Sequence, residues 1–411
     1  MTGWVRIKQD KPTLLLAKGD MSRLGGAERD LLRVLPSLTK YYQVRLATLR
    51  TCDEMLEICK QNSVEIFTPD TPWQIPTGAF ANIRDMIHKS SKLAWQSCVG
   101  LEEFMQKCDF FHIVSGDGYL AIIEMIPKNS PSHLHLLEPH RGLHEDSLHR
   151  KLNGKLKRPN IITNFLLRKS RNNDLRIVRE FYNRKHSVVS SNSHYSSSRA
   201  GEVYKIKSGV LHPCVDFNEY SVQESPSKIF PFEGEYVVTI GTAIWAKGTM
   251  EVIDMLKGTD ISLAHVGGGT QQEKEEIDEH AKNSSVDLWI APRLSSEDLS
   301  ALMQNSLAVV SMAHKEPFGL TPIEAFSIGT PAIFVDEGGF RDSIIDGVCG
   351  RLLDRNDYSK WHEALEQCRD EKTRQEWSKA GIERIKDLKM SPQDQAEKIH
   401  NLLNQVSKVN L

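Results

Sequence analysis

The chain has 411 residues, of which 39% are apolar and 26% are charged, and its formal net charge at pH 7 is −2. A chain of this length carries enough apolar material for two domains that each bury a core, which excludes a single small binding module. The balanced charge offers no general attraction for a polyanion, so we expect no nucleic-acid partner. We therefore expect function to come from particular sites.

The seven cysteines are scattered along the chain and form no Cys-x-x-Cys pair. This usage is typical of reduced thiols in the cytoplasm. No stretch reaches the roughly 18 consecutive apolar residues that a membrane span requires. The sequence therefore predicts a cytoplasmic protein that is either dissolved or bound at the inner face of the membrane.

Residues 1–215 alternate between strand and helix patterns. The apolar run 13–17 predicts a buried strand, and it precedes a Gly25-Gly26 turn and a helical leucine pattern. Further strands are predicted at 43–48, 111–114, 132–137 and 187–191. This rhythm is typical of a doubly wound parallel sheet, so we expect a first Rossmann-like α/β domain here.

A segment rich in Ser, Pro, Glu and Phe, residues 216–233, predicts an interdomain linker. A second α/β domain is expected over residues 234–390, with strands at 236–240, 262–266, 286–290, 308–311 and 332–335. Residues 391–411 predict a carboxyl-terminal helix that returns to the first domain. Two such domains should face one cleft, because ligands bind beyond the carboxyl ends of parallel strands.

The most informative stretch is Glu-Pro-Phe-Gly-Leu-Thr-Pro-Ile-Glu, which begins at residue 316. Thr321 is a suitable N-cap, Pro322 suits the first helical position, and Glu324 completes a Thr-x-x-Glu capping box. The pattern predicts that a helix begins here with its amino end toward the cleft.

That amino end has the properties of an anion site. Backbone N–H groups near Phe318, Gly319 and Leu320, together with the helix dipole, suit a pyrophosphate. Glu316 is then placed to reach sugar hydroxyls and Glu324 to reach a ribose. Taken alone, Glu316 is better explained as a solvated loop carboxylate and Glu324 as a capping residue.

The two glutamates resemble the Glu-x7-Glu signature of retaining GT-B glycosyltransferases, in particular the GT4-like family known as group 1. Other segments are similar in the same order: Gly25-Gly26-Ala27-Glu28 and residues 192–195, 210–216, 241–248, 266–269, 295–302 and 338–342. The resemblance implies a GT-B fold with two Rossmann-like domains, in which residues 1–215 bind the acceptor and residues 234–390 bind the nucleotide-sugar donor. It also implies transfer of a hexose from a UDP- or GDP-hexose to a glycan, lipid-linked or small-molecule acceptor, with retention of configuration.

The resemblance also assigns site residues. Lys247 matches the lysine that binds the donor phosphates, and the implied catalytic set is Glu316, Lys247 and His140. The implied donor-binding set is Gly25, Gly26, Thr242, Lys247, Arg293, Phe318, Gly319, Leu320 and Glu324. No Asp-x-Asp pair is present to hold a divalent ion on the phosphates, so we expect no metal and no cofactor beyond the nucleotide sugar.

Two positions depart from the family pattern. Thr242 stands where the family usually has an arginine on the phosphates, and Leu137 stands where it usually has a histidine near the reacting sugar. Either His135, His140 or Arg141 takes over, or the alignment differs here, or the protein is a weak or inactive relative that binds sugar nucleotides as a partner subunit. His140 and Arg141 are equally explained as a surface loop pair.

A nicotinamide oxidoreductase is a further alternative, based on Gly267-Gly268-Gly269. The dinucleotide fingerprint needs a third glycine where this chain has Gln272, which argues against that class.

Residues 150–185 are strongly basic and contain interleaved apolar side chains. This pattern predicts either an interfacial helix that contacts an anionic membrane surface or a solvated helical face with a core stripe. Periodicity alone does not separate the two.

Overall fold

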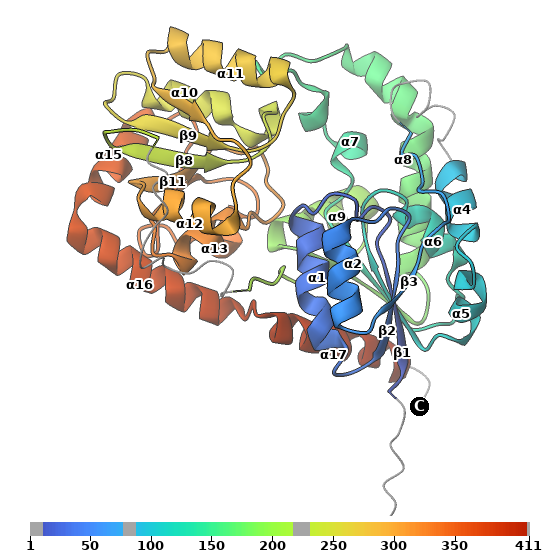
Figure 1. The fold of residues 1–411 in the computed structure, drawn as a ribbon. Helices are drawn as coiled ribbons and strands as arrows, with labels where there is room; N and C mark the ends of the chain where they lie inside the picture. Colours follow the sequence, from blue (N-terminus) through green and yellow to red (C-terminus); the bar gives the residue numbers. More distant parts are fainter. Residues whose placement is uncertain (1–10, 77–87, 217–230, 409–411) are drawn as a thin grey trace, which may run out of the picture.

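The computed structural model describes residues 11–76, 88–216 and 231–408, which form two α/β domains, each built on a parallel sheet (Figure 1). Of the linker expected at 216–233, residues 217–230 lie outside the described part of the chain. The two Rossmann-like domains expected from the sequence are confirmed.

The first sheet has seven parallel strands in the order β3-β2-β1-β4-β5-β6-β7. Their bounds are β1 Thr13–Ala17, β2 Gln43–Ala47, β3 Glu65–Phe67, β4 Phe110–Val114, β5 Ser132–Leu137, β6 Ser187–Ser191 and β7 Gly209–Val210. Alternation along β1 sends Leu14 and Leu16 into one apolar core and Leu15 and Ala17 into another. Both faces of this sheet are therefore buried, as expected for parallel strands.

The second sheet has six strands in the order β10-β9-β8-β11-β12-β13. Their bounds are β8 Tyr236–Ile240, β9 Ser262–Val266, β10 Leu288–Ile290, β11 Ala308–Ser311, β12 Ala332–Val335 and β13 Arg351–Leu353. In both sheets the strand order reverses beside the first strand of the domain, between β1 and β4 and between β8 and β11. Such a reversal opens a crevice at the carboxyl ends of the strands, where ligands bind.

Helices cover both sheets. In the first domain they are α1 Gly26–Leu38, α2 Asp53–Gln61, α4 Lys89–Gln96, α5 Leu101–Lys107, α6 Tyr119–Met125, α7 Arg141–His144, α8 Asn160–Tyr182 and α9 His194–Tyr204. In the second they are α10 Thr249–Leu256, α11 Gln271–Asn283, α12 Ser296–Gln304, α13 Thr321–Ser327, α14 Phe340–Ser343, α15 Tyr358–Arg369 and α16 Glu371–Leu388. Within the described residues, 3-10 helices span Ser147–His149 and Trp245–Lys247.

The last helix, α17 Pro392–Ser407, packs on α1 of the first domain (Figure 1). It begins at Ser391, whose hydroxyl caps the helix in a capping box. The Gln395 amide donates to both carboxylate oxygens of Asp30, at 3.0 and 3.1 Å. The hydroxyl of Tyr42 lies 2.9 Å from His400 Nδ1. The chain therefore crosses back after α16, which ties the carboxyl terminus to the helix that follows β1.

Candidate active site

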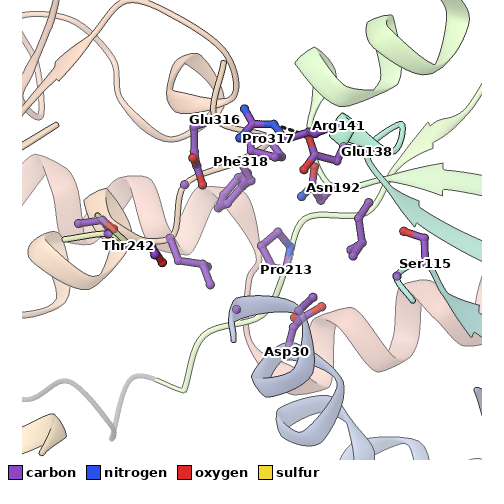
Figure 2. Close-up of a pocket in the computed structure, with 18 of the residues that line it drawn as sticks. Asp30, Ser115, Glu138, Arg141, Asn192, Pro213, Thr242, Glu316, Pro317 and Phe318 are labelled. Carbon is purple, nitrogen blue, oxygen red and sulfur yellow. Dashed lines mark ion pairs between the residues drawn. The ribbon is translucent and has the colours of Figure 1, made fainter. Parts of the chain in front are cut away.

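A cleft of about 650 Å³ lies between the two domains. It is lined by residues that follow β1, β4 and β5 in the first domain and β8 in the second, together with residues 316–321 and Glu324 (Figure 2). Its volume is in the range that encloses a ligand of moderate size. The cleft lies where the strand order of each sheet reverses, which is the position expected for a ligand site.

An ion pair stands on the second-domain side of the cleft. Lys247 Nζ lies 2.9 Å from Oε2 and 3.1 Å from Oε1 of Glu316. Lys247 ends the 3-10 helix that follows β8, and its stem runs across Gly241. A Cβ at Gly241 would lie 2.9 Å from the Lys247 side chain, so glycine leaves the space that the lysine occupies.

The loop that carries Glu316 is shaped by two glycines that lie after β12. A Cβ at Gly338 would overlap the carbonyl oxygen of Glu316, and one at Gly339 would overlap that of Pro317. The N–H of Gly339 donates to the Glu316 carbonyl at 2.8 Å. Lys315 adopts a left-handed backbone with φ of 51°. Such strain in a non-glycine residue persists only where the surroundings enforce it, and here it directs the next residue into the cleft.

The first-domain wall begins at the end of β5. Leu137 has φ of 59°, and the β5–β6 register shifts between His135 and Leu137. The next residue, Glu138, forms an ion pair with Arg141, whose Nε lies 3.2 Å from Glu138 Oε2. The Arg141 guanidinium also donates to the carbonyl oxygens of His314, at 2.8 Å, and Lys315. Arg141 therefore joins the two domains beside the Glu316 loop (Figure 2).

Two carboxyl groups at the cleft differ in their protonation state. Burial raises the pKa of Glu138 to about 8, with Arg141 opposing the rise and Glu316 adding to it. Burial also acts against ionisation of Glu316, but the charges of Lys247 and Arg141 hold its pKa below the usual range. At neutral pH Glu138 is therefore mostly protonated and can donate a hydrogen bond, whereas Glu316 is a carboxylate.

Residues 223–384 match the family described as "Glycosyl transferases group 1". The carboxyl-terminal domain belongs to this family. A D-inositol 3-phosphate glycosyltransferase of Corynebacterium diphtheriae is 28% identical over 164 residues, 38% of this chain and 38% of that protein. An alpha-1,3/1,6-mannosyltransferase of Neurospora crassa is 24% identical over 164 residues, 39% of this chain and 33% of that protein. The aligned segments thus span well under half the length of these two relatives.

Solved structures extend the likeness to nearly the whole chain. The Anabaena protein HepE, in complex with UDP and glucose, has a TM-score of 0.68 at 18% identity and covers 96% of this chain and 100% of its own. The sucrose-phosphate synthase of Thermosynechococcus elongatus has a TM-score of 0.73 at 15% identity, with 97% and 99% covered. At these identities the likeness concerns the fold. The GT-B architecture expected of a group 1 glycosyltransferase is confirmed.

The cleft gathers most of the side chains and loops that the sequence singled out. Those that line it are Gly26, His140, Thr242, Lys247, Glu316, Phe318, Gly319, Leu320 and Glu324. Gly25 lies just outside as the N-cap of α1, and its N–H donates to Glu28. Arg293 is an exposed residue beyond β10 and is not part of the cleft lining. Donor binding and catalysis by all of these residues stay predictions.

The expected capping box at α13 is wrong. Leu320, with φ of −73° and ψ of −25°, is the N-cap, and Thr321 is already helical. An N-cap side chain needs an extended backbone to reach back to the first turn. The turn at Gly319, with φ of +80°, brings the chain into the helix one residue early. Glu324 is therefore not half of a capping box, and it lines the cleft instead.

Lys18 was missed in the sequence. It follows β1 directly, is buried, and lines the cleft. Its Nζ donates to the Ser115 carbonyl at 2.7 Å and lies 3.0 Å from Glu28 Oε1. Glu138 was also not singled out in the sequence. The rule that ligands bind at the carboxyl ends of parallel strands would have pointed to both, since each follows a predicted strand directly.

Proposed function

We propose that the protein is a glycosyltransferase that moves a hexose from a UDP- or GDP-hexose to an acceptor, with retention of the anomeric configuration. The observation that carries this proposal is the Lys247–Glu316 pair in the interdomain cleft of a group 1 GT-B chain. It is supported by solved structures of HepE, which are complexes with UDP and with UDP-glucose. The acceptor is a glycan, a lipid-linked sugar or a small molecule.

In this proposal Lys247 moves from Glu316 toward the donor diphosphate. Its ammonium offsets the negative charge that grows on the leaving group as the glycosidic bond breaks. Backbone N–H groups of residues 318–320 add further donors, and Glu324 binds the ribose. Glu316 then accepts hydrogen bonds from hydroxyls of the transferred sugar.

The acceptor lies on the first-domain side in this proposal. The protonated carboxyl of Glu138 is suited to donate a hydrogen bond to an acceptor oxygen, and His140 lines the same wall. His135 is fully buried in the sheet and is not part of the cleft lining, so it is not the group that replaces the histidine missing at Leu137. His140 and Arg141 are the groups at the cleft that are placed to do so.

We expect one molecule of UDP or GDP to bind per chain in the presence of EDTA, because Lys247 supplies the positive charge that a divalent ion would otherwise provide. Isothermal titration calorimetry with both nucleotides, with EDTA and then with magnesium, tests this. Binding of neither nucleotide, or binding only after magnesium is added, would contradict the proposed donor site.

A membrane contact is proposed for the amino-terminal end of α8. Ile161 and Phe165 have exposed fractions of 83% and 77%, and Ile162 is also exposed. Exposed basic residues flank them at Lys155, Lys157, Arg158, Arg168 and Lys169. No helix in the described residues is long and apolar enough to cross a membrane. Exposed apolar side chains among basic ones suit insertion at the surface of an anionic membrane.

We expect flotation with anionic liposomes but not with neutral ones, with loss of binding as salt rises. Each basic residue at the surface contributes about 1 kcal/mol to such binding. Replacing Phe165 with serine should weaken flotation, whereas Ile382→Ser, at an exposed apolar position on α16, serves as the matched control. Equal flotation with both kinds of liposome, or with neither, rejects this contact.

A further inference from the structure

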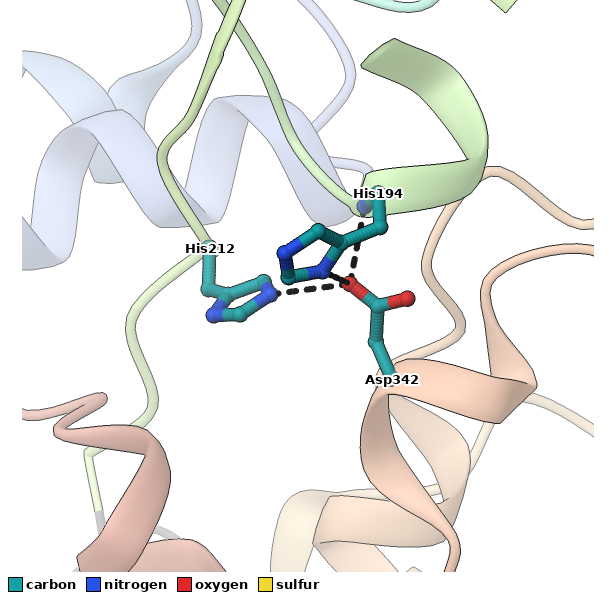
Figure 3. Close-up of side chains that lie close together, drawn as sticks. All are labelled: His194, His212 and Asp342. Atoms are coloured by element: carbon teal, nitrogen blue, oxygen red, sulfur yellow. Dashed lines mark hydrogen bonds and ion pairs between the residues drawn. The ribbon is translucent and has the colours of Figure 1, made fainter. Parts of the chain in front are cut away.

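A cluster of two histidines and one aspartate lies at the contact between the domains, outside the cleft lining (Figure 3). His194 Nδ1 lies 2.9 Å and His212 Nε2 lies 3.0 Å from the same oxygen, Oδ2 of Asp342. His194 opens α9 and His212 follows β7, both in the first domain, whereas Asp342 belongs to α14 in the second. The three ligand-type atoms lie within 4.8 Å of one another.

The surroundings hold these side chains in place. The backbone N–H of His194 also donates to Asp342 Oδ2, at 2.8 Å. Arg384 donates to the main-chain carbonyl of Asp342, at 2.5 Å, which fixes α14 against α16. The ring of His212 packs on Phe318, with centroids 5.3 Å apart. These contacts hold the three residues in place independently of the hydrogen bonds between the imidazole rings and the Asp342 carboxylate.

Two imidazole nitrogens and a carboxylate oxygen are a ligand set that zinc binds, with bonds of about 2.0–2.2 Å. At those bond lengths tetrahedral ligands stand roughly 3.3 Å apart, so the pairs at 2.9 and 3.0 Å need to separate by only a few tenths of an ångström. The side chains of His212 and Asp342 are 13% and 6% exposed, whereas His194 is 77% exposed. Solvent thus reaches the cluster from the His194 side, where an ion would enter and keep a water as its fourth ligand.

Each ring nitrogen that faces Asp342 now carries a proton in order to donate to the carboxylate. A metal ion takes the place of both protons, and each neutral imidazole then carries its proton on the other ring nitrogen. Magnesium prefers oxygen ligands and octahedral geometry, so it does not match this set.

We propose that His194, His212 and Asp342 form a binding site for a divalent transition-metal ion, best matched by zinc, that ties the two domains together. The site is separate from the donor site, which needs no metal in the function proposed above. Because its ligands come from both domains, a bound ion stabilises the arrangement in which α9 meets α14.

The test is a calorimetric titration of EDTA-treated, dialysed protein with zinc chloride at neutral pH, without any nucleotide. We expect one ion per chain, and at least tenfold weaker binding in His212→Ala and in the conservative variant Asp342→Asn. His280→Ala is the matched control, because His280 pairs with Asp254 at 2.8 Å within one domain. It should bind zinc as the unchanged protein does, and magnesium chloride should not bind at this site.

A second readout is the melting temperature, which zinc should raise in the unchanged protein and in His280→Ala but not in the two cluster variants. Cobalt in place of zinc should give the visible absorption of a tetrahedral site without a thiolate charge-transfer band. Lack of zinc binding, or equal binding in all variants, would show that the cluster is a hydrogen-bonded interdomain contact only. These outcomes do not depend on sugar-nucleotide binding, so they leave the proposed glycosyltransferase activity untouched.

Discussion

Glu316→Gln is expected to lower turnover about 100-fold or more while leaving the affinity for free UDP or GDP unchanged or slightly tighter. The glutamine keeps the shape of the side chain but loses the charge that orients the sugar in the transition state, a loss of the size seen for other electrostatic groups in active sites. The same change frees Lys247 from its ion pair, at 2.9 Å, for the phosphates. Lys247→Met, by contrast, should weaken nucleotide affinity and turnover together.

Calorimetry gives the affinities, and release of nucleoside diphosphate from the sugar nucleotide gives the turnover. Glu103→Gln is a suitable control, because it breaks an exposed Glu103–Lys107 pair, at 2.7 Å, on α5. It should change neither quantity. If Glu316→Gln and Lys247→Met weaken nucleotide binding equally, the division of roles between sugar and phosphate is wrong.

Acid should destabilise the protein through three histidines buried in the first sheet. His112 on β4 and His133 on β5 face each other with their Nδ1 atoms 2.9 Å apart, and His135 lies beside them. Burial lowers the pKa of His112 and of His135 to about 3 and that of His133 well below its usual range. Unfolded histidines take up protons near pH 6.5, so below that pH the unfolded state binds more protons than the folded state.

These histidines therefore cost stability as the pH falls from about 6.5 toward 3, by about 1.4 kcal/mol per pH unit for each. Asp30 and Glu138 act in the opposite direction, because their pKa values are raised to about 6 and about 8 and the folded state binds the extra protons. A variant comparison isolates the histidine contribution. His135 is the best target, since its buried Nε2 has no hydrogen-bond partner in the structure.

His135→Leu should gain about 2 kcal/mol of unfolding free energy relative to the unchanged protein between pH 8 and pH 5. A change in packing alters the unfolding free energy by the same amount at both pH values, so it does not contribute to this difference. Urea unfolding at the two pH values is the measurement, with His280→Leu as the surface control. An identical change in unfolding free energy at pH 8 and pH 5 for His135→Leu would contradict the buried, neutral state of this histidine.

The strands were largely predictable from the sequence because they are buried on both faces and appear as apolar runs. Residues 13–17 and 308–311 are such runs, and the structure has strands at both. The strands β3, β7 and β13 were missed because they are two or three residues long and lie toward the sheet edges. A run that short has no periodicity to detect.

The candidate site was predictable in part. A local motif identified Glu316 and the residues after it, and the family resemblance identified Lys247; the structure brings them into one cleft. The contact of Arg141 with the carbonyl oxygens of His314 and Lys315 joins loops more than 170 residues apart, and no local pattern encodes it.

The left-handed backbone at Leu137 was equally hidden, because leucine gives no sign of such a conformation. The group of buried histidines in the first sheet was partly predictable. Alternation along β5 places His133 and His135 on one face of the sheet, but their partner His112 follows only from the β4–β5 register.

One assay tests directly whether the protein cleaves a sugar nucleotide with Lys247 and Glu316. UDP- and GDP-hexoses are incubated with the protein, and the release of nucleoside diphosphate to water or to added acceptors is followed. We expect release from one nucleotide class by the unchanged protein in the presence of EDTA, and release at least about 100-fold slower in Glu316→Gln. Tight nucleotide binding without any release, or equal rates in both proteins, would contradict the proposed function and would favour a partner subunit that binds sugar nucleotides without transferring the sugar.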